Sequence, residues 1–429
     1  MLFGSIVAEE LYKFMKSKYV YMDYAATTPV DSRVEKSMQK YRSMEFGNPS
    51  SIHSMGVIAK RAVEDSRKKV AEVLDTSPEE IVFTSGGTEG DNMAIFGVAR
   101  SVRERYKDKY NHIITTAIEH HAVSSPCRAL EREGFEVTYL PVSSDGIVDP
   151  DNVKRAIRPD TFLVSVMYAN NEIGTIQPIA EIAKVIRRCR LDGGFAIKSG
   201  TKLPLLHTDA CQAPGSLPLN VLKMGVDLMT ISGSKIYGPK GVGALYVKSG
   251  TEILPILYGG GQERGLRSGT ENVASIVGFA VALELSEKMR EKEGVRLGKL
   301  RDYFAKSILK IVPGSEVNGT LDSLGAKLPK KRLPNNLNIF VPHIDNEQLV
   351  IELDALGVAV SAGSACNSNE STGSHVIWAL YHDIERNKGS IRFTLGRSTT
   401  KKDVDFILRS LPEILGRIKS EKSPAGCGA

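Results

Sequence analysis

The segment at residues 83–92 (FTSGGTEGDN) combines the end of a strand, a pair of glycines and a hydroxyl at the start of a helix. Gly86 and Gly87 carry no side chain, so their backbone N–H groups can approach a ligand closely. Thr88 adds a hydroxyl at the positive end of the helix, where anions bind. The segment is a candidate phosphate cradle, with a threonine-capped tight turn as the simpler alternative. It does not match the G-x-x-x-x-G-K-S/T pattern, which argues against a nucleotide hydrolase.

Two further segments place an ionisable side chain beside a predicted core strand. In HTDACQ (207–212), Asp209 follows an apolar run, and a buried carboxylate without a partner is costly. Asp209 therefore needs a cationic partner such as a protonated ring nitrogen, unless it caps the next turn. In TISGSKIYGPKG (230–241), Lys235 follows a strand and a Ser-Gly-Ser turn. Partial desolvation lowers the pKa of an amine in such a place and suits it to Schiff-base chemistry.

The fourth candidate segment, AVSAGSACNSNESTGS (359–374), surrounds Cys366 with Ser, Asn and Gly and shows no apolar periodicity. This composition predicts an exposed loop, and a reactive cysteine has to be accessible. The other four cysteines lie on predicted helices, beside Asp209 or in the C-terminal tail. Cys366 is therefore the candidate nucleophile.

The framework that holds these segments alternates short β-rich runs with helical patterns from about residue 80 to 250. Runs such as FLVSVM (162–167) are continuously apolar, which is typical of strands covered on both faces. The predicted strands lie at 80–86, 112–117, 135–142, 161–169, 203–210, 227–232 and 243–248. Strands separated by helices predict an α/β protein with a mostly parallel sheet and helices on both faces.

The pattern changes near residue 275. One long helical pattern, rich in Lys, Glu and Arg, covers 274–311, and a strand, a further helix and a last helix at 402–418 follow. We predict a large domain over 21–274 and a smaller α+β domain over 275–429, which residues 1–20 are expected to join. The basic stretch Lys327, Lys330, Lys331 and Arg332 is expected to be a solvated face, with docking of an acidic acceptor as the alternative.

The composition limits the class of protein. The chain has 429 residues, 41% hydrophobic and 25% charged, which is the globular range. Its 56 basic and 50 acidic residues leave a net charge of +6, too small to predict nucleic-acid binding. No stretch approaches the roughly 18 apolar residues that span a membrane. Glu9 and Glu10 argue against a secretory or transit signal, and five scattered cysteines against disulfides or a zinc site. Cytoplasm is the expected compartment.

The sequence resembles the cysteine desulfurase family, within the class-V aminotransferases of fold type I pyridoxal phosphate enzymes. The resemblance rests on ten motifs that occur in family order from residue 21 to about 400. They are YMDYAATTP (21–29), FGNPSS (46–51), the cradle, IEH (118–120), NNEIGTIQP (170–178), HTDACQ, SKIYGPKG, GGGQERGLRSGTEN (259–272), SAGSAC and SIRFTLGR (390–397).

The resemblance implies a role for each matching residue. Lys235 would form the Schiff base with pyridoxal phosphate, and Asp209 would pair with the pyridine nitrogen. His120 would lie over the ring and move protons. The other implied cofactor contacts are Gly87, Thr88, Ser232 and Ser234 at the phosphate, Thr270 from the second subunit of a homodimer, and Asn171 and Gln212 near the ring and the Schiff base.

The resemblance also implies the reaction. Arg392 would bind the carboxylate of the substrate L-cysteine in a bidentate fork, with Asn171 nearby. Cys366 would attack the substrate sulfur, keep it as a persulfide and release L-alanine. The persulfide would supply sulfur to an acceptor protein such as an iron–sulfur scaffold, or to thio-cofactors or tRNA. No metal and no membrane or nucleic-acid partner is implied.

The sequence departs from the family pattern at three places. Ser234 replaces the usual His before the lysine, Cys211 occupies a position that is usually Ser, Thr or Ala, and about a dozen residues are inserted at 191–202, where we expect an exposed loop. A selenocysteine lyase shares the cofactor residues and stays an alternative. A cofactor-free homologue that only docks on a scaffold is the other alternative, although retention of Lys235, Asp209, Arg392 and Cys366 together argues against it.

Overall fold

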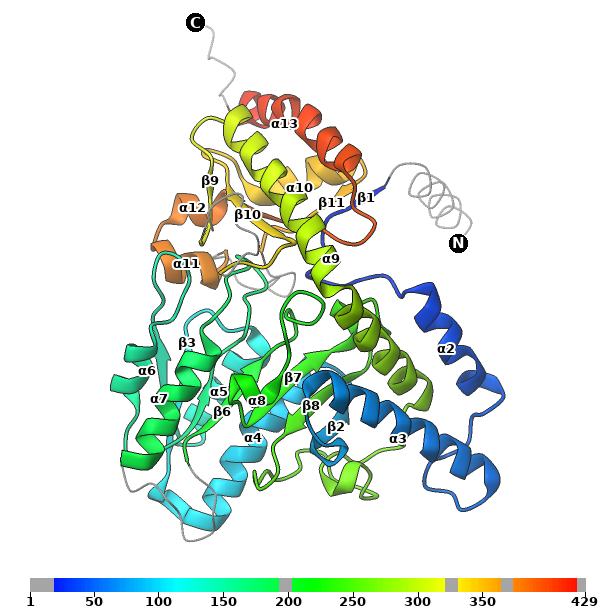
Figure 1. Ribbon diagram of the computed structural model, residues 1–429. Helices are drawn as coiled ribbons and strands as arrows, with labels where there is room; N and C mark the ends of the chain where they lie inside the picture. Colours follow the sequence, from blue (N-terminus) through cyan, green and yellow to red (C-terminus); the bar gives the residue numbers. More distant parts are fainter. Residues whose placement is uncertain (1–18, 193–202, 321–330, 364–372, 423–429) are drawn as a thin grey trace, which may run out of the picture. The chain divides into compact units, whose positions relative to one another are not determined.

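The computed structural model describes residues 19–192, 203–320, 331–363 and 373–422 (Figure 1). Cys366, Cys427 and most of the predicted insertion lie outside the described residues. The chain divides into two compact units. The large unit comprises 27–170 and 176–292, and the small unit comprises 171–175 and the described residues up to 26 and from 293 onward. The division falls inside one long helix after Lys292, whereas the sequence pattern placed a boundary near residue 275.

A seven-stranded sheet forms the centre of the large unit, and each strand lies within a predicted strand. The strands are β2 (Ile81–Thr84), β3 (His112–Thr116), β4 (Glu136–Leu140), β5 (Thr161–Ser165), β6 (Leu205–Asp209), β7 (Leu228–Ser232) and β8 (Gly243–Val247). Their order is β2-β8-β7-β6-β5-β3-β4, with β8 antiparallel to both neighbours and the remaining pairs parallel. The predicted α/β class with a mostly parallel sheet is confirmed.

The central strands are buried on both faces. Every residue of β5, β6 and β7 is buried, including Phe162, Leu163 and Val164 of the run that predicted this. Parallel strands have this composition because the crossover helices cover both sides of the sheet. Polar side chains at the carboxyl ends of these strands therefore lie next to a core that excludes water.

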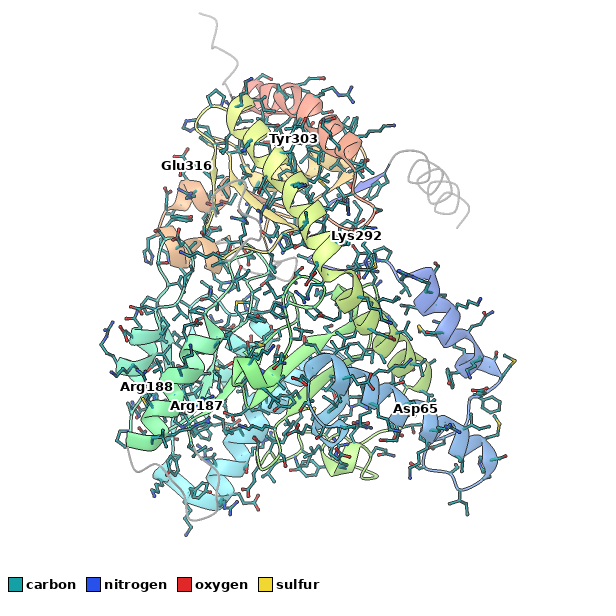
Figure 2. The ribbon with its side chains drawn as sticks, in the orientation of Figure 1. Asp65, Arg187, Arg188, Lys292, Tyr303 and Glu316 are labelled. Atoms are coloured by element: carbon teal, nitrogen blue, oxygen red, sulfur yellow. The ribbon has the colours of Figure 1, made fainter. Side chains whose placement is uncertain are left out.

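Five helices connect the parallel strands: α4 (Gly87–Tyr106), α5 (His121–Arg132), α6 (Pro150–Ala156), α7 (Ile179–Asp192) and α8 (Val221–Met224). Right-handed crossovers place α4 and α5 on one face and α6, α7 and α8 on the other (Figure 1). Helix α7 packs on the sheet through an apolar face and turns a charged face to solvent. Ile182 and Ile186 are buried, whereas Arg187 and Arg188 are exposed (Figure 2).

The rest of the large unit contains longer helices and short 3-10 turns. The helices are α2 (Ser32–Ser43), α3 (Ser54–Leu74) and the part of α9 (Val273–Ile311) up to Lys292. The 3-10 turns are Pro78–Glu80, Lys107–Lys109, Gly233–Lys235 and Glu263–Gly265. The predicted long helix from residue 274 is thus present from Val273.

The small unit is built on an antiparallel sheet. Strand β10 (Asn336–Phe340) lies between β12 (Ser390–Thr394) and β9 (Glu316–Val317), and β1 (Val20–Tyr21) pairs in parallel with β11 (Val358–Ala359). The helices are α10 (Asn346–Ala355), α11 (His375–Tyr381), α12 (Ile384–Lys388), α13 (Lys401–Lys422) and the end of α9. Phe304 and Phe393 stack edge to face in its core with ring centres 4.9 Å apart.

The prediction of a solvated basic face is wrong at Arg332. Its side chain is 2% exposed, and its guanidinium donates to the backbone oxygens of Asn336, Asn318 and Thr320 at 2.9–3.0 Å. A run of charges in the sequence does not reveal carbonyl acceptors that the fold brings from other segments. Lys331 is exposed, and Lys327 and Lys330 lie outside the described residues.

Helix α4 approaches the sheet closely because it begins with small residues. A Cβ atom on Gly90 would lie 2.7 Å from Cγ2 of Thr230, on β7. A methyl group therefore cannot be added without moving the helix or the strand. This contact holds the N-terminal turn of α4 against the ends of the central strands.

We expect Gly90→Ala to lower the free energy of unfolding of the apo-protein by about 1–3 kcal/mol, the usual cost of overpacking. Gly416→Ala, in α13, is the matched control. Nothing lies within 4 Å of the position that its added methyl group would occupy, so the variant should gain about 0.5–1 kcal/mol from helix propensity. Urea unfolding of both variants tests this. Wild-type stability in Gly90→Ala would contradict the close approach.

Candidate cofactor and substrate site

The carboxylate predicted to pair with a cation is at the carboxyl end of a central strand. Asp209 is the last residue of β6 and is 6% exposed. One of its oxygens accepts a hydrogen bond from the backbone N–H of Cys211 at 2.9 Å. Asp209 pairs in register with Thr230 on β7, two residues before that strand ends. The side chain is thus fixed at the carboxyl ends of the central strands, where ligands of α/β proteins bind.

The predicted phosphate cradle lies beside this carboxylate. Gly86 precedes α4 with φ +150°, a conformation that favours glycine. A Cβ atom on Gly87 would lie 2.5 Å from Sγ of Cys211. Because Cys211 follows Asp209 by two residues, the start of α4 and the end of β6 are in contact. The first N–H groups of a helix have no partners within the helix, so they are available to an anion.

The lysine and two serines follow the next strand. Ser232 ends β7, and Lys235 lies in the 3-10 turn Gly233–Lys235 that comes directly after it. The hydroxyl oxygens of Ser232 and Ser234 are 3.1 Å apart. Lys235 is half-buried, as a Schiff-base amine should be. Two candidate anion ligands and the amine thus project from one short turn.

Thr28 positions this turn, although no pattern in the sequence gave it a role. Its backbone N–H and its hydroxyl both donate to the carbonyl oxygen of Ser234, at 2.9 and 3.0 Å. The hydroxyl oxygen also accepts from the N–H of Tyr237 at 2.7 Å. The motif YMDYAATTP contains Thr28, and its two adjacent threonines were the available signal.

His120 caps helix α5 with its side chain. Its Nδ1 accepts a hydrogen bond from the backbone N–H of Ala122 at 3.1 Å. Nδ1 therefore carries no proton, which leaves Nε2 as the nitrogen that can gain or lose one. The cap fixes the ring direction at the carboxyl end of β3.

Glu119 is a buried carboxyl for which the sequence predicted no role. It is 1% exposed, and Oε1 accepts from the hydroxyl of Thr116 at 2.7 Å and the N–H of Met167 at 2.9 Å. Burial raises the pKa of Glu119 to about 8. The residue joins β3 to the end of β5 next to His120, and the IEH motif carried its signal.

Arg392, predicted to bind a carboxylate, lies on β12 of the small unit and is 2% exposed. One terminal nitrogen donates to Oδ1 of Asp23 at 2.7 Å, and the other donates to the carbonyl oxygen of Asn171 at 2.9 Å. Its buried Nε has no hydrogen-bond partner in the part of the chain that the structure describes. Asn171 and Arg392 are thus brought together, and Asp23 is a partner that the sequence did not indicate.

The described residues that flank the predicted cysteine loop share one carboxylate. The hydroxyl of Ser374 donates to Oε2 of Glu172 at 2.5 Å, and a Cβ atom on Gly363 would lie 3.5 Å from the same oxygen. Glu172 is buried in the small unit. Cys366 itself lies outside the described residues, so its predicted role stays a prediction.

Thr270 is exposed on a loop that two ion pairs anchor to the large unit. Glu263 is buried and binds both terminal nitrogens of Arg67, on α3, at 2.7 and 2.9 Å. Arg267 donates to Glu89, in the first turn of α4, at 2.7 Å. The loop is therefore held firmly, with its threonine directed to the surface.

Neither of the two cysteines nearest the sheet is an activated nucleophile. Burial and the neighbouring Asp209 raise the pKa of the Cys211 thiol well above its usual range. Burial also raises the pKa of Cys127 to about 12. Both thiols stay protonated near neutral pH, and only a thiolate is a good nucleophile.

The comparisons with known proteins agree with this geometry. Residues 20–407 match the family model described as aminotransferase class-V. The chain belongs to the class-V aminotransferase family. A cysteine desulfurase IscS of Dictyoglomus turgidum is 46% identical over 401 residues, covering 94% of this chain and 95% of that protein.

Two solved structures are also similar. A NifS-like protein has a TM-score of 0.81 and 37% identity, covering 93% of this chain and all of that one. The structure described as SspA in complex with cysteine has a TM-score of 0.72 and 34% identity, covering 88% and 98%. The predicted resemblance to cysteine desulfurases, with its pyridoxal phosphate dependence, is confirmed.

The site residues of this chain fit pyridoxal phosphate. Asp209 suits the pyridinium end, and the half-buried Lys235 suits the aldehyde. The start of α4 and the hydroxyls of Ser232 and Ser234 offer donors to a phosphate. The lack of room for a side chain at Gly87 shows that the start of α4 packs directly against Cys211, two residues after Asp209. The predicted roles of the single residues stay predictions.

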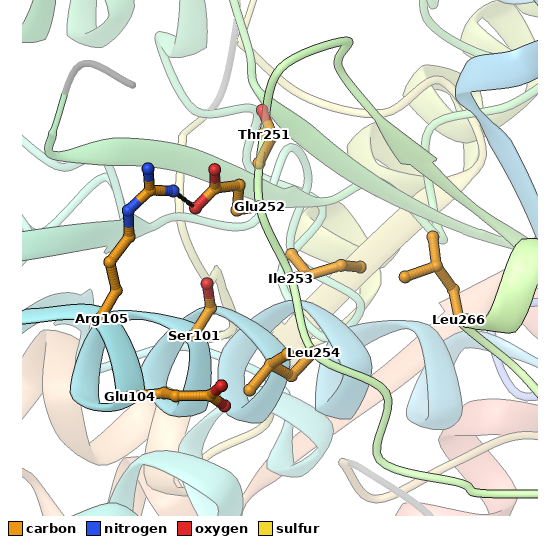
Figure 3. A pocket seen from close by; sticks show the side chains of 8 residues that line it. All are labelled: Ser101, Glu104, Arg105, Thr251, Glu252, Ile253, Leu254 and Leu266. Carbon is orange, nitrogen blue, oxygen red and sulfur yellow. Dashed lines mark hydrogen bonds and ion pairs between the residues drawn. The ribbon is translucent and has the colours of Figure 1, made fainter. Parts of the chain in front are cut away.

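A separate pocket of about 490 Å³ lies at the other end of α4 (Figure 3). It is lined by Ser101, Glu104, Arg105, Thr251, Glu252, Ile253, Leu254 and Leu266, and an ion pair joins Arg105 to Glu252. None of the predicted site residues lines it. Among the described residues, no group of His, Cys, Asp or Glu is arranged to hold a metal. No described helix is both long and apolar enough to cross a membrane.

The raised pKa of Glu119 makes stability depend on pH. The folded protein keeps this proton up to about pH 8, whereas the unfolded chain releases it near the ordinary value of 4.5. Between these values the folded state holds one more proton, so its stability falls by about 1.4 kcal/mol per pH unit as pH rises. Glu119→Gln removes this loss, and its stability relative to wild type should increase from about pH 5 to about pH 7.

Urea unfolding of the apo-protein at several pH values measures this difference. Glu104→Gln, an exposed position on α4, is the control and should show a constant difference from wild type. A constant difference for Glu119→Gln as well would mean that Glu119 is ionised in the folded protein.

Proposed function

We propose that the protein removes sulfur from L-cysteine with the help of pyridoxal phosphate, releasing L-alanine and keeping the sulfur as a persulfide on Cys366. The observation that carries this proposal is the pairing of β6 with β7. It sets the carboxylate of Asp209 and the amine of Lys235 at neighbouring strand ends, beside the start of α4. The similarity to SspA, whose structure contains cysteine, supports the choice of substrate.

The cofactor contacts divide by chemistry. Gly87, Thr88, Ser232 and Ser234 donate hydrogen bonds to the phosphate, together with the first N–H groups of α4. Asp209 holds a proton on the pyridine nitrogen, and Asn171 and Gln212 contact the ring and the Schiff-base region. Bound pyridoxal phosphate supplies an electron sink for the electron pair released at the substrate.

Arg392 binds the substrate carboxylate. Its buried Nε has no partner among the described residues, and a guanidinium can bind a carboxylate through two parallel N–H groups. Asp23 and the Asn171 carbonyl already orient the same guanidinium. A lysine could not satisfy these three acceptors in one plane.

Protons move through His120 and Lys235. The N-cap hydrogen bond leaves Nε2 of His120 as its exchangeable site. The Lys235 amine would be the second group that accepts a proton and returns it at the substrate carbon. Cys366 attacks the substrate sulfur as a thiolate. The carbon–sulfur bond breaks, its electron pair stays with the carbon, and protonation of the carbon completes L-alanine.

The protein acts as a homodimer in this proposal. Thr270 is exposed on an anchored loop, so it is available to complete the phosphate site of a second subunit. The persulfide then passes to a sulfur-acceptor protein, such as an iron–sulfur scaffold, in the cytoplasm. A selenocysteine lyase is the alternative, and comparison of turnover with L-cysteine and L-selenocysteine distinguishes the two.

The test of the proposed function is to add L-cysteine and a thiol reductant to the purified holoenzyme and to quantify alanine and sulfide. Equal amounts of both products are expected. Cys366→Ser should still bind L-cysteine and change the cofactor absorbance, but release no sulfide. Cys189→Ser, on α7, is the matched control and should retain sulfide release.

Lys235→Ala should abolish turnover because it removes the amine that holds the cofactor. Borohydride reduction of the wild type should attach the cofactor to Lys235. Normal sulfide release from Cys366→Ser, or attachment to another lysine, would overturn the assignments.

Ser234 should contribute to cofactor affinity rather than to chemistry. A hydrogen bond to a charged group is worth about 1.5–3 kcal/mol, so Ser234→Ala should raise the cofactor dissociation constant about tenfold to a hundredfold. Turnover at saturating cofactor should change much less. Titration of the apo-enzyme measures this, with Ser249→Ala, an exposed serine after β8, as control. An unchanged constant would mean that the Ser234 hydroxyl only supports the turn.

A further inference from the structure

A second buried carboxyl lies in the core near Asp209. Asp91, on the first turns of α4, is 0% exposed. The close contact of Gly90 with Thr230 brings this part of α4 onto β7, directly beside β6. No role for Asp91 follows from the proposed reaction, so its burial requires an explanation.

A buried histidine lies close to Asp91. His207 lies two residues before Asp209 on β6, and its Nε2 is 3.5 Å from Oδ1 of Asp91. The same ring is bound on both sides: Nδ1 is 2.8 Å from the hydroxyl of Ser165, and Nε2 is 3.1 Å from the hydroxyl of Thr230. Among the described residues, no hydrogen bond satisfies either carboxyl oxygen of Asp91.

The charges around Asp91 oppose its ionisation. Burial, and then the neighbouring Asp209, raise the pKa of Asp91 well above its usual range. The Thr230 hydroxyl acts in the opposite direction without cancelling them, and Glu119 adds a small further increase in this pKa. Two carboxylates close together in a water-excluded site cannot both be charged cheaply. Asp209 has a backbone N–H donor and, in the proposed function, a cation to face. The negative charge therefore belongs on Asp209.

An ion pair between Asp91 and a protonated His207 is the competing arrangement. Burial lowers the pKa of His207 to about 4, so a charged ring is unfavourable there. The 3.5 Å separation is also longer than the 2.7–2.9 Å of a charge-assisted hydrogen bond. The geometry favours two neutral groups.

We propose that Asp91 is a protonated positioning residue that leaves Asp209 as the ionised carboxylate of this buried group and holds His207 neutral. The His207 ring then donates from Nδ1 to Ser165. Its unprotonated Nε2 faces the Thr230 hydroxyl at 3.1 Å and the neutral carboxyl of Asp91 at 3.5 Å. A neutral acid behind Asp209 keeps a second negative charge away from it, so Asp209 can hold its own charge for the cofactor. Only this last consequence rests on the proposed function.

Infrared spectroscopy of the apo-protein tests the protonation directly. Aspartate labelled with carbon-13 separates the protonated Asp signal from that of Glu119, which is also expected to be protonated. At neutral pH we expect a protonated-aspartate band in the wild type and in Asp209→Asn, and no such band in Asp91→Asn. A band that persists in Asp91→Asn, or that is absent from the wild type, would overturn the proposal.

The cofactor provides a second readout. Asn is neutral and has the shape of a protonated Asp, so Asp91→Asn should keep the cofactor dissociation constant within about threefold and its absorbance maximum unchanged, since threefold is about 0.7 kcal/mol. Asp91→Ala should raise the constant at least tenfold because it leaves a cavity and frees His207. If Asp91→Asn weakened binding as much as Asp91→Ala, the charge of Asp91 would be required and the proposal would fail.

The infrared result does not depend on desulfurase activity. A protein that showed the Asp91 band but released no sulfide from L-cysteine would contradict the proposed function and support the assignment of Asp91. The reverse pair of results would contradict the assignment of Asp91 alone.

Discussion

The large unit depends on the close packing of the N-terminal turn of α4 against the ends of β6 and β7. Gly87 leaves room only for the sulfur of Cys211, and Gly90 leaves room only for the methyl group of Thr230. Backbone N–H groups, a carboxylate and an amine therefore occupy one small region without a long loop between them. The same packing buries Asp91 and requires that its charge be removed.

The sequence was sufficient for the sheet and for the residue types of the site. The fully buried strands were recognisable because continuous apolar runs such as 162–167 occur where both faces are covered. Asp209 and Lys235 were recognisable because an ionisable residue at the end of such a run needs a purpose. The pairing of β6 with β7, which brings them together, was not readable, since strand order is not encoded in local pattern.

The supporting residues were missed for a related reason. Thr28, Glu119 and Asp23 act through hydrogen bonds to segments far away in the chain, so their own neighbours give no indication. Arg332 was wrongly predicted to be exposed. A run of basic residues indicates a solvent-exposed surface, but here carbonyl oxygens from other segments bind the Arg332 guanidinium. Local patterns predict which elements form, and long-range hydrogen bonds decide what a polar side chain does.

In the proposed function, where Arg392 binds the substrate carboxylate, its ion pair with Asp23 has a consequence for substrate selection. A free arginine side chain carries about 2 kcal/mol of conformational entropy, which is lost when the guanidinium is fixed. In this protein folding has already fixed it, so an arriving ligand does not have to. A small amino acid, which makes few contacts of its own, can therefore bind to a guanidinium that is already rigid before the ligand arrives.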